Sequence, residues 1–179
     1  MLNKIKNNKD HNILKSSLIE TLLGPILLIA DENSLYFLGF NDEKNINKDI
    51  EKLKNTTQLD IISGENKIIT SIKHELDDYF SGRLKKFKTP IAYIGTPFQI
   101  KVWKELEKIP HGQTQSYYDI ATAIGSPKNF RGVGQANSAN NLSIIIPCHR
   151  VINKNKQLGG YSGGLDRKIW LLNHERINL

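Results

Sequence analysis

The pattern of apolar residues changes near residues 89–95, and this change constrains the fold more than any other feature of the chain. Between Ser17 and Phe40, short apolar runs alternate with turn residues, which is typical of strands joined by tight turns. Further along, apolar residues recur at helical spacing behind capping residues. A chain of 179 residues can hold two small hydrophobic cores. We therefore expect an α/β (α+β) protein, with an N-terminal α/β domain over residues 1–90 and a helical C-terminal domain over residues 95–179.

Two helices are predicted in the N-terminal domain. Residues 44–56 are charged with sparse apolar positions, which favours a surface helix. A second helix is predicted to begin after a cap at Asn66 and to end at Ser81-Gly82. Its core-facing side chains fall at helical spacing: Ile68, Ile72, Leu76, Tyr79 and Phe80. This half of the sequence shows no pattern that indicates chemistry.

The C-terminal domain is predicted to open with a well-capped helix. Thr96-Pro97 supplies a capping hydroxyl followed by proline at the first helical position. Residues 110–112, Pro-His-Gly, are predicted to stop this helix. One face of it carries Phe98, Val102, Leu106 and Ile109, with Trp103 beside them, and we expect both tryptophans of the chain to be core residues.

Two further short helices form a pattern typical of a helix-turn-helix. The first is predicted over residues 117–124, and Gly125 makes the turn. Ser126 and Pro127 are predicted to cap and open the second, which runs from about residue 128 to residue 137. A plain helical hairpin has the same pattern, so both interpretations stay open at this point.

The remainder of the sequence predicts an extended segment, a loop and a final helix. The apolar run at residues 142–146 favours a strand leading into Pro147-Cys148-His149-Arg150. A glycine-rich loop at residues 159–164 follows. The last helix is predicted to begin at Leu165 and to end near His174-Glu175.

Positive charge is concentrated in the second half of the chain. The net charge is +7, and residues 91–179 contain eleven Lys and Arg against five Asp and Glu. This asymmetry favours a surface for nucleic acid or another polyanion. A solvated basic face explains the charge equally well.

The composition also excludes several classes of protein. One cysteine permits no internal disulfide and no cysteine-based zinc site, and the five histidines lack ligand spacing, so we expect no metal. The longest apolar runs, Ile26–Ala30 and Ile144–Ile146, are too short to span a membrane or to form a signal core. We therefore expect a cytoplasmic protein that does not associate with membranes.

Cys148 is the candidate nucleophile because polar partners follow it directly. A free thiol is mostly protonated at neutral pH, so a reactive cysteine needs a base or a positive field. His149 and Arg150 could provide both, but neighbouring side chains of an extended segment point to opposite faces. Contact between His149 and the sulfur then requires a turn or a bridging water, and Glu175 is a candidate to orient the imidazole. The alternative is an inert buried thiol, with Glu175 as a surface residue.

Residues 145–152, Ile-Ile-Pro-Cys-His-Arg-Val-Ile, resemble the signature of the O6-alkylguanine-DNA alkyltransferases, the methylated-DNA–protein-cysteine methyltransferases. The resemblance extends over about residues 95–176, whereas residues 1–90 match the family only in size and strand pattern. The other positions that carry it are Phe98-Gln99, Val102-Trp103, Ile109-Pro110, Gly112, Ser116-Tyr117, Gly125, Pro127-Lys128, Arg131, Val133-Gly134, Asn140, Gly159–Gly164, Leu171-Leu172 and Glu175.

This resemblance implies a fold and a reaction. The N-terminal domain would be ribonuclease-H-like, and the C-terminal domain would be winged-helix-like, with its helix-turn-helix in the minor groove of double-stranded DNA. Cys148 would accept an alkyl group from O6-alkylguanine, with O4-methylthymine as a further candidate, once per molecule and without a cofactor. His149 would be the water-mediated base, Glu175 its orienting partner, and Asn140 would hold the turn before the active-site segment. We expect the protein to act as a monomer.

The resemblance also implies roles in binding DNA and the target base. Arg131 would fill the stack after the nucleotide is flipped out, because a base inside a duplex cannot be reached. Tyr117 would donate to the guanine ring, and Tyr161 would wall its pocket. The Val151 carbonyl and the Ser162 amide would read the edge of the base. Ser126 and Arg150 complete the predicted contacts with DNA or substrate.

Two departures and two alternatives accompany this hypothesis. Gly132 stands where the family usually has alanine and Asn141 where proline is common, so we expect a looser third helix and a less rigid turn. One alternative is a non-catalytic sensor of alkylated bases, but sensors of that kind carry tryptophan in place of the cysteine. The other is a cysteine hydrolase, for which the sequence offers no acyl pocket.

Overall fold

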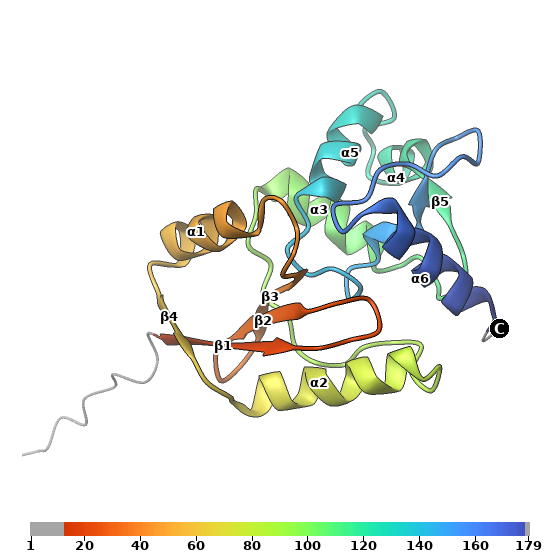
Figure 1. Cartoon of the computed structure of the whole chain (residues 1–179). Helices are drawn as coiled ribbons and strands as arrows, with labels where there is room; N and C mark the ends of the chain where they lie inside the picture. Colours follow the sequence, from red (N-terminus) through yellow and green to blue (C-terminus); the bar gives the residue numbers. More distant parts are fainter. Residues whose placement is uncertain (1–12, 178–179) are drawn as a thin grey trace, which may run out of the picture.

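The computed structural model describes residues 13–177 and contains a sheet with two helices followed by a mostly helical part (Figure 1). The first part comprises β1 (Ile13–Ile19), β2 (Ile26–Ala30), β3 (Leu35–Phe40), α1 (Ile46–Thr57), β4 (Asp60–Ser63) and α2 (Lys67–Phe80). The second comprises α3 (Pro97–Leu106), β5 (Gln115–Ser116), α4 (Tyr117–Ala123), α5 (Phe130–Ser138), the 3-10 turn η2 (Cys148–Arg150), β6 (Val151–Ile152) and α6 (Leu165–Ile177). The predicted two-part α/β architecture is confirmed.

The four-stranded sheet has the order β3-β2-β1-β4, antiparallel except for the parallel pair of β1 with β4. Strands β2 and β3 coincide with two of the predicted apolar runs. Strand β1 begins at Ile13, before the predicted region, and Leu22-Leu23 lies in the turn that follows it. Strand β4 was not predicted, because its four residues are mostly exposed and lack an apolar alternation.

Helices α1 and α2 cover opposite faces of this sheet. Alternate residues of β2 point to opposite sides, as the strand geometry requires. Leu28 packs with Ile72 of α2 in the larger hydrophobic cluster, whereas Ile29 packs with Leu53 of α1 in the smaller one. Both helices were predicted, and the cap at Asn66 is confirmed because its side chain accepts from the Ile69 amide.

The outer edge of β3 connects the two parts of the chain. The Leu35 amide donates to the Pro90 carbonyl, so the linker covers one end of this edge. At the other end, the Leu38 amide donates to the Asn141 carbonyl, and the Ser143 amide donates to the Leu38 carbonyl. An unpaired strand edge is thereby covered. The same bonds fix the segment that leads to Cys148 against the sheet.

The C-terminal helices agree with the sequence pattern except at three boundaries. Thr96 and Gln99 form the expected cap of α3, but the helix ends at Leu106, and Ile109 lies in the turn beyond it. Helix α5 begins at Phe130, so the prediction that Ser126 and Pro127 open it is wrong. Residues 126–129 form a turn instead, in which the Asn129 amide donates to the Ser126 carbonyl. Helix α6 continues two residues beyond the predicted end.

The expected strand over residues 142–146 is also wrong. Leu142 makes one isolated bridge with Leu38, and the following residues form a turn. Ile144 has a φ of 71°, which is unfavourable for a β-branched side chain, and the Ile146 amide donates to the Leu142 carbonyl. A short apolar run does not distinguish a buried strand from a buried turn.

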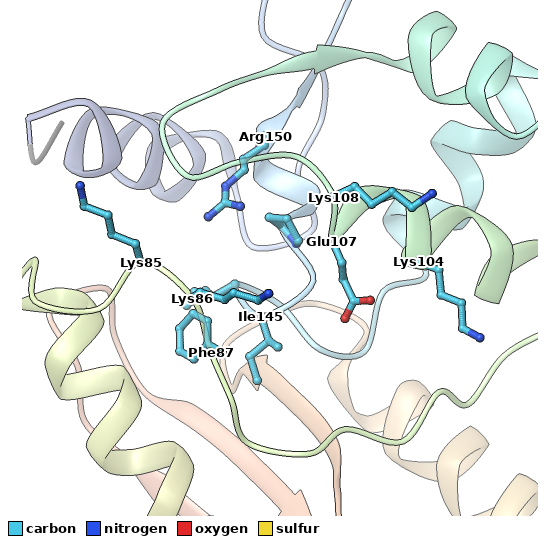
Figure 2. Close-up of a pocket in the computed structure, with 10 residues that line it drawn as sticks. Lys85, Lys86, Phe87, Lys104, Glu107, Lys108, Ile145 and Arg150 are labelled. Atoms are coloured by element: carbon cyan, nitrogen blue, oxygen red, sulfur yellow. The ribbon is translucent and has the colours of Figure 1, made fainter.

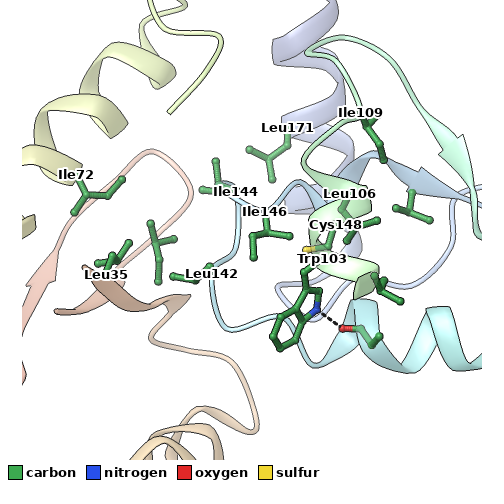
Figure 3. Packing of buried hydrophobic residues seen from close by; sticks show 14 of the residues in the cluster. Leu35, Ile72, Trp103, Leu106, Ile109, Leu142, Ile144, Ile146, Cys148 and Leu171 are labelled. Atoms are coloured by element: carbon green, nitrogen blue, oxygen red, sulfur yellow. Dashed lines mark hydrogen bonds between the residues drawn. The ribbon is translucent and has the colours of Figure 1, made fainter. Parts of the chain in front are cut away.

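One hydrophobic cluster extends through both parts of the molecule. It joins Leu35 and Ile72 from the sheet side to Trp103, Ile146 and Leu171 from the helical side (Figure 3). Within residues 13–177, no helix has the length and apolar content that crossing a membrane requires. The same residues hold no cluster of His, Cys, Asp and Glu side chains that fits a metal ion.

Candidate active site

Cys148 begins a tight 3-10 turn at the end of the strained segment. The turn is closed by the Arg150 amide, which donates to the Pro147 carbonyl at 3.0 Å. The expected extended backbone is therefore wrong here. Because the chain turns, Cys148 and His149 are not forced onto opposite faces. The Cys148 side chain lies against the core near Trp103, Leu106 and Ile146 and is 1% exposed (Figure 3).

Asn140 contacts the sulfur directly. Its Nδ2 donates to Cys148 Sγ at 3.2 Å and to the Ile146 carbonyl at 2.9 Å. Its Oδ1 accepts from the Leu142 amide at 3.0 Å. Asn140 thus bonds to both ends of the turn over residues 142–146, the turn to which the resemblance assigns it, and its Nδ2 is a donor that stabilises a developing thiolate.

The resting thiol is protonated at neutral pH. Burial raises the pKa of Cys148 to about 11, although the Asn140 hydrogen bond and the charge of Lys168 lower it. Arg150, the other group that could favour the thiolate, has its charge matched by Glu175 at 2.9 Å. A thiolate at this position therefore requires a base that removes the proton.

Glu175 is fully buried and accepts five hydrogen bonds from residues far apart in the sequence. His149 Nε2 lies 2.8 Å from Oε1, and Arg150 makes a two-point contact through Nε and Nη2, both at 2.9 Å. The Tyr79 hydroxyl donates at 2.9 Å and the Gly112 amide at 3.3 Å. These donors outweigh the effect of burial and lower the pKa of Glu175, so the carboxylate is ionised.

The ionised carboxylate determines which nitrogen of His149 carries the proton. A carboxylate only accepts, so Nε2 must donate to Glu175. Burial lowers the pKa of His149, which keeps the ring neutral and leaves the lone pair on Nδ1. Nδ1 is buried and has no hydrogen-bond partner within residues 13–177. His149, the residue after Cys148, therefore has a basic nitrogen, Nδ1, that is available to accept a proton.

Tyr117 and Tyr161 come from different elements and lie at this same site. Tyr117, on α4, packs so closely on Gly159 that a Cβ there would lie 2.7 Å from the tyrosine hydroxyl oxygen. The Tyr161 ring meets the His149 ring edge-on, with centroids 6.5 Å apart. The Tyr161 hydroxyl is buried without a hydrogen bond to any described residue, although Ser143 is a close polar neighbour.

Lys168 fixes the loop that carries the predicted base-reading groups. Its Nζ donates to the Val151 carbonyl at 2.6 Å and to the Gly159 and Gly160 carbonyls, both at 3.3 Å. The Val151 carbonyl thus already accepts one hydrogen bond and has one lone pair left for a base. Ser162 lies exposed in the same loop. Burial lowers the pKa of the Lys168 ammonium to about 8.

Arg131, Ser126 and Arg150 are placed in three different settings. Arg131 is exposed near the start of α5, and Ser126 is partly exposed in the turn before that helix. Arg150 is 7% exposed and faces the interior, so its placement differs from the predicted contact with DNA. Its guanidinium binds Glu175 and the Ile109 carbonyl because an ionised carboxylate next to it is buried.

Three residues of the site carry little signal in the sequence. Tyr79 belongs to an ordinary amphipathic helix, and Lys168 is a charged residue in a helix, where exposure is the usual expectation. Asn137 ends the predicted third helix, yet it is 4% exposed, and its Nδ2 donates to the Cys148 carbonyl at 3.2 Å. Its Oδ1 is buried without a partner among the described residues. Polar residues at core spacing were the signal that could have revealed Lys168 and Asn137.

Two family models match almost the whole chain. Residues 14–93 match the ribonuclease-like domain of 6-O-methylguanine DNA methyltransferase, and residues 97–177 match its DNA binding domain.

Named relatives and solved structures agree with these matches. The chain is 44% identical to the constitutive methylated-DNA–protein-cysteine methyltransferase of Bacillus subtilis, covering 89% of this chain and 93% of the relative. It is 42% identical to the methylated-DNA–protein-cysteine methyltransferase of Methanosarcina barkeri, covering 90% of this chain and 97% of the relative. The crystal structure of Mycobacterium tuberculosis OGT in complex with DNA matches with a TM-score of 0.78 and 34% identity, covering 93% of this chain and 94% of that one. The chain belongs to the 6-O-methylguanine DNA methyltransferase family.

Proposed function

We propose that this protein repairs DNA by moving an alkyl group from O6 of guanine to Sγ of Cys148, once per molecule. The observation that carries the proposal is the arrangement around one thiol. Asn140 donates to Sγ at 3.2 Å, and Glu175 leaves His149 with a free basic nitrogen. The relatives named above are methylated-DNA–protein-cysteine methyltransferases, which supports the same reaction for this chain.

The reaction begins with removal of the thiol proton. The proton passes through a bridging water to Nδ1 of His149, and Glu175 stabilises the resulting imidazolium. The Asn140 amide stabilises the thiolate as it forms. Because the pKa of the resting thiol is raised, the nucleophile is generated only when a substrate is in place.

The thiolate then attacks the alkyl carbon. A sulfur–carbon bond forms while the carbon–O6 bond breaks, and the electron pair stays on the guanine. The Tyr117 hydroxyl donates toward the ring and reduces the charge of this leaving group. The Val151 carbonyl and the Ser162 amide hold the edge of the base, and Tyr161 walls its pocket. The product is a thioether, which water does not cleave, so the protein reacts once and needs no cofactor.

DNA is recognised through α4 and α5 in the minor groove, with the target nucleotide flipped out of the stack. Extrusion costs a few kcal/mol, which Arg131 offsets by entering the stack. Its exposure on α5 leaves the side chain free to do so. Ser126 lies in the preceding turn, where it can contact the backbone. The protein acts as a monomer, with an N-terminal domain over residues 1–90 and the DNA-binding domain over residues 95–179.

Gly132, which stands where the family usually has alanine, lies next to the side chain of Asn129. A Cβ at this position would lie 2.4 Å from Oδ1 of Asn129, the residue before α5. The glycine therefore leaves room for that side chain at a cost of about 0.5–1 kcal/mol of helix stability relative to alanine. At the other departure, the Asn141 carbonyl is held by Leu38, so β3 supports the turn.

Replacement of Arg131 tests the proposed base flipping. Arg131→Ala is expected to slow repair of a duplex at least about tenfold, because about 1.4 kcal/mol or more of extrusion energy is no longer offset. Reaction with the free base O6-benzylguanine should change less than twofold, roughly, since nothing must be extruded. Both rates are measured in single turnover, with Lys101→Ala on α3 as an exposed control. Equal losses on duplex and free base would refute the role of Arg131.

A further inference from the structure

A cavity of about 320 Å³ lies behind the turn that carries Cys148. Figure 2 shows it between the linker that follows α2 and the C-terminal end of α3. Its apolar lining consists of Phe87 from the linker and of Ile144, Ile145 and Pro147, which lead into the nucleophile. Cys148 itself is not among the lining residues, so this space is distinct from the proposed base pocket.

The polar lining of the cavity is dominated by cations. Four lysines and one arginine line it against a single carboxylate, Glu107, which accepts a hydrogen bond from the Tyr93 hydroxyl. Lys108 is paired with Glu105, and Lys104 lies over the Tyr93 ring at 5.5 Å. The remaining lysines, Lys85 and Lys86, are exposed and form no ion pair within residues 13–177. The cavity therefore carries unmatched positive charge.

Arg150 adds a fixed donor to these mobile lysines. Its side chain is buried and held by Glu175 and the Ile109 carbonyl, which use three of its N–H groups. A guanidinium has five N–H groups, so two remain for a ligand in the cavity. A buried guanidinium cannot swing away, and its donors are pre-organised for an oxyanion. Figure 2 shows the guanidinium directed toward the linker that carries Lys85 and Lys86, with the Lys85 ammonium group pointing away from it.

We propose that this cavity binds a phosphate group. Phosphate combines one or two negative charges with several acceptor oxygens, which matches a fixed guanidinium in a cavity that lysines also line. The phosphate has two possible sources, a free phosphate compound or a phosphodiester of a DNA segment other than the one held at Arg131. The site is linked to the catalytic histidine through Arg150 and Glu175, and binding there does not depend on alkyl transfer.

Titration with inorganic pyrophosphate tests the proposal on the full chain. Calorimetry should give saturable binding to one site in the wild type. The double variant Lys85→Gln/Lys86→Gln should bind at least about tenfold more weakly, since two of the unmatched charges are lost. A control with the same loss of charge, Lys48→Gln/Lys54→Gln on α1, should stay within about twofold of the wild type. In NMR spectra, the Arg150 Nε–H signal should move during the titration of the wild type.

Three outcomes would overturn the site: equal affinity in the wild type and the Lys85/Lys86 variant, an equal loss in the α1 control, or an Arg150 signal that does not move. A second arm separates the two sources. If DNA is the occupant, pyrophosphate should displace the second duplex from a complex with two undamaged duplexes, and the Lys85/Lys86 variant should bind only one. If a free phosphate compound is the occupant, duplex binding should be the same in both proteins. Alkyl transfer by the variant is scored separately, so failure of the proposed function is distinguishable from failure of this site.

Discussion

The two sides of the Cys148 turn differ in how their buried polar groups are satisfied. On one side, Glu175 accepts hydrogen bonds from Tyr79, Gly112, His149 and Arg150. On the other, Nδ1 of His149, Oδ1 of Asn137 and the Tyr161 hydroxyl are buried without partners among the described residues, whereas one further such atom, Nδ1 of His111, lies on the Glu175 side. Unpaired buried polar atoms are rare and costly, so their clustering around one thiol indicates a site completed by a ligand. The first side supports the site, and we propose that the second receives the substrate.

Glu175→Gln should produce the largest loss of stability. Without the carboxylate, the Arg150 charge stays buried and uncompensated, which costs about 3–5 kcal/mol. Chemical denaturation measures this loss. Asp78→Asn, which breaks the exposed pair with Arg83, is the matched control and should cost about 1 kcal/mol or less. Similar losses in both variants would mean that the two sides of the turn do not differ as described.

The raised pKa of Cys148 predicts a steep pH dependence of thiol reactivity. The thiol stays neutral below a pKa of about 11, so its thiolate fraction grows as pH rises toward that value. Alkylation of the folded protein by iodoacetamide should therefore accelerate about hundredfold between about pH 8 and 10. In urea, the rate should level off near the ordinary thiol pKa. A folded-state profile that is flat above neutral pH would contradict the protonated resting state.

The smallest expected changes in stability come from removing the hydroxyl groups of two buried tyrosines, Tyr79 and Tyr161. Tyr79→Phe removes a donor to the Glu175 carboxylate and should cost about 1.5–3 kcal/mol. Tyr161→Phe removes a hydroxyl that has no hydrogen-bond partner within residues 13–177 and should change stability by less than about 0.5 kcal/mol or increase it. Both values come from the same denaturation experiment, and the chemical change is identical. A larger loss of stability for Tyr161→Phe than for Tyr79→Phe would mean that the Tyr161 hydroxyl has a hydrogen-bond partner in the folded protein, which would contradict the comparison.

The sequence predicted correctly those helix ends that depend only on neighbouring residues. Asn66 and Thr96 cap their helices as expected, because a cap depends on residues within one turn. The strand predicted from the apolar run at residues 142–146 was wrong, because a buried turn and a buried strand need the same kind of side chains. The start of α5 also failed, because Ser126 closes a turn with Asn129 before the helix begins.

The site was predictable where a family motif existed and hidden where long-range pairing decides. Arg150 lies two residues after Cys148 in the sequence, yet its role depends on a carboxylate 25 residues away. Tyr79 reaches the same carboxylate across 96 residues, from the half of the chain that showed no chemical pattern. Lys168 is buried only because three backbone carbonyls converge on its ammonium. The spacing on α6 places Lys168 among the core positions, but it does not show that these carbonyls accept hydrogen bonds from the ammonium.

The central claim is that Sγ of Cys148 takes the alkyl group, and mass spectrometry of the protein after reaction tests it most directly. The fully reduced protein is mixed with a duplex containing one O6-methylguanine and is then digested. We predict one methyl group per protein molecule on the peptide that contains Cys148, guanine restored in the DNA, and neither change with Cys148→Ser. A lesion that stays intact while the thiol remains unmodified, or DNA that is bound without transfer as by a damage sensor, would contradict the account.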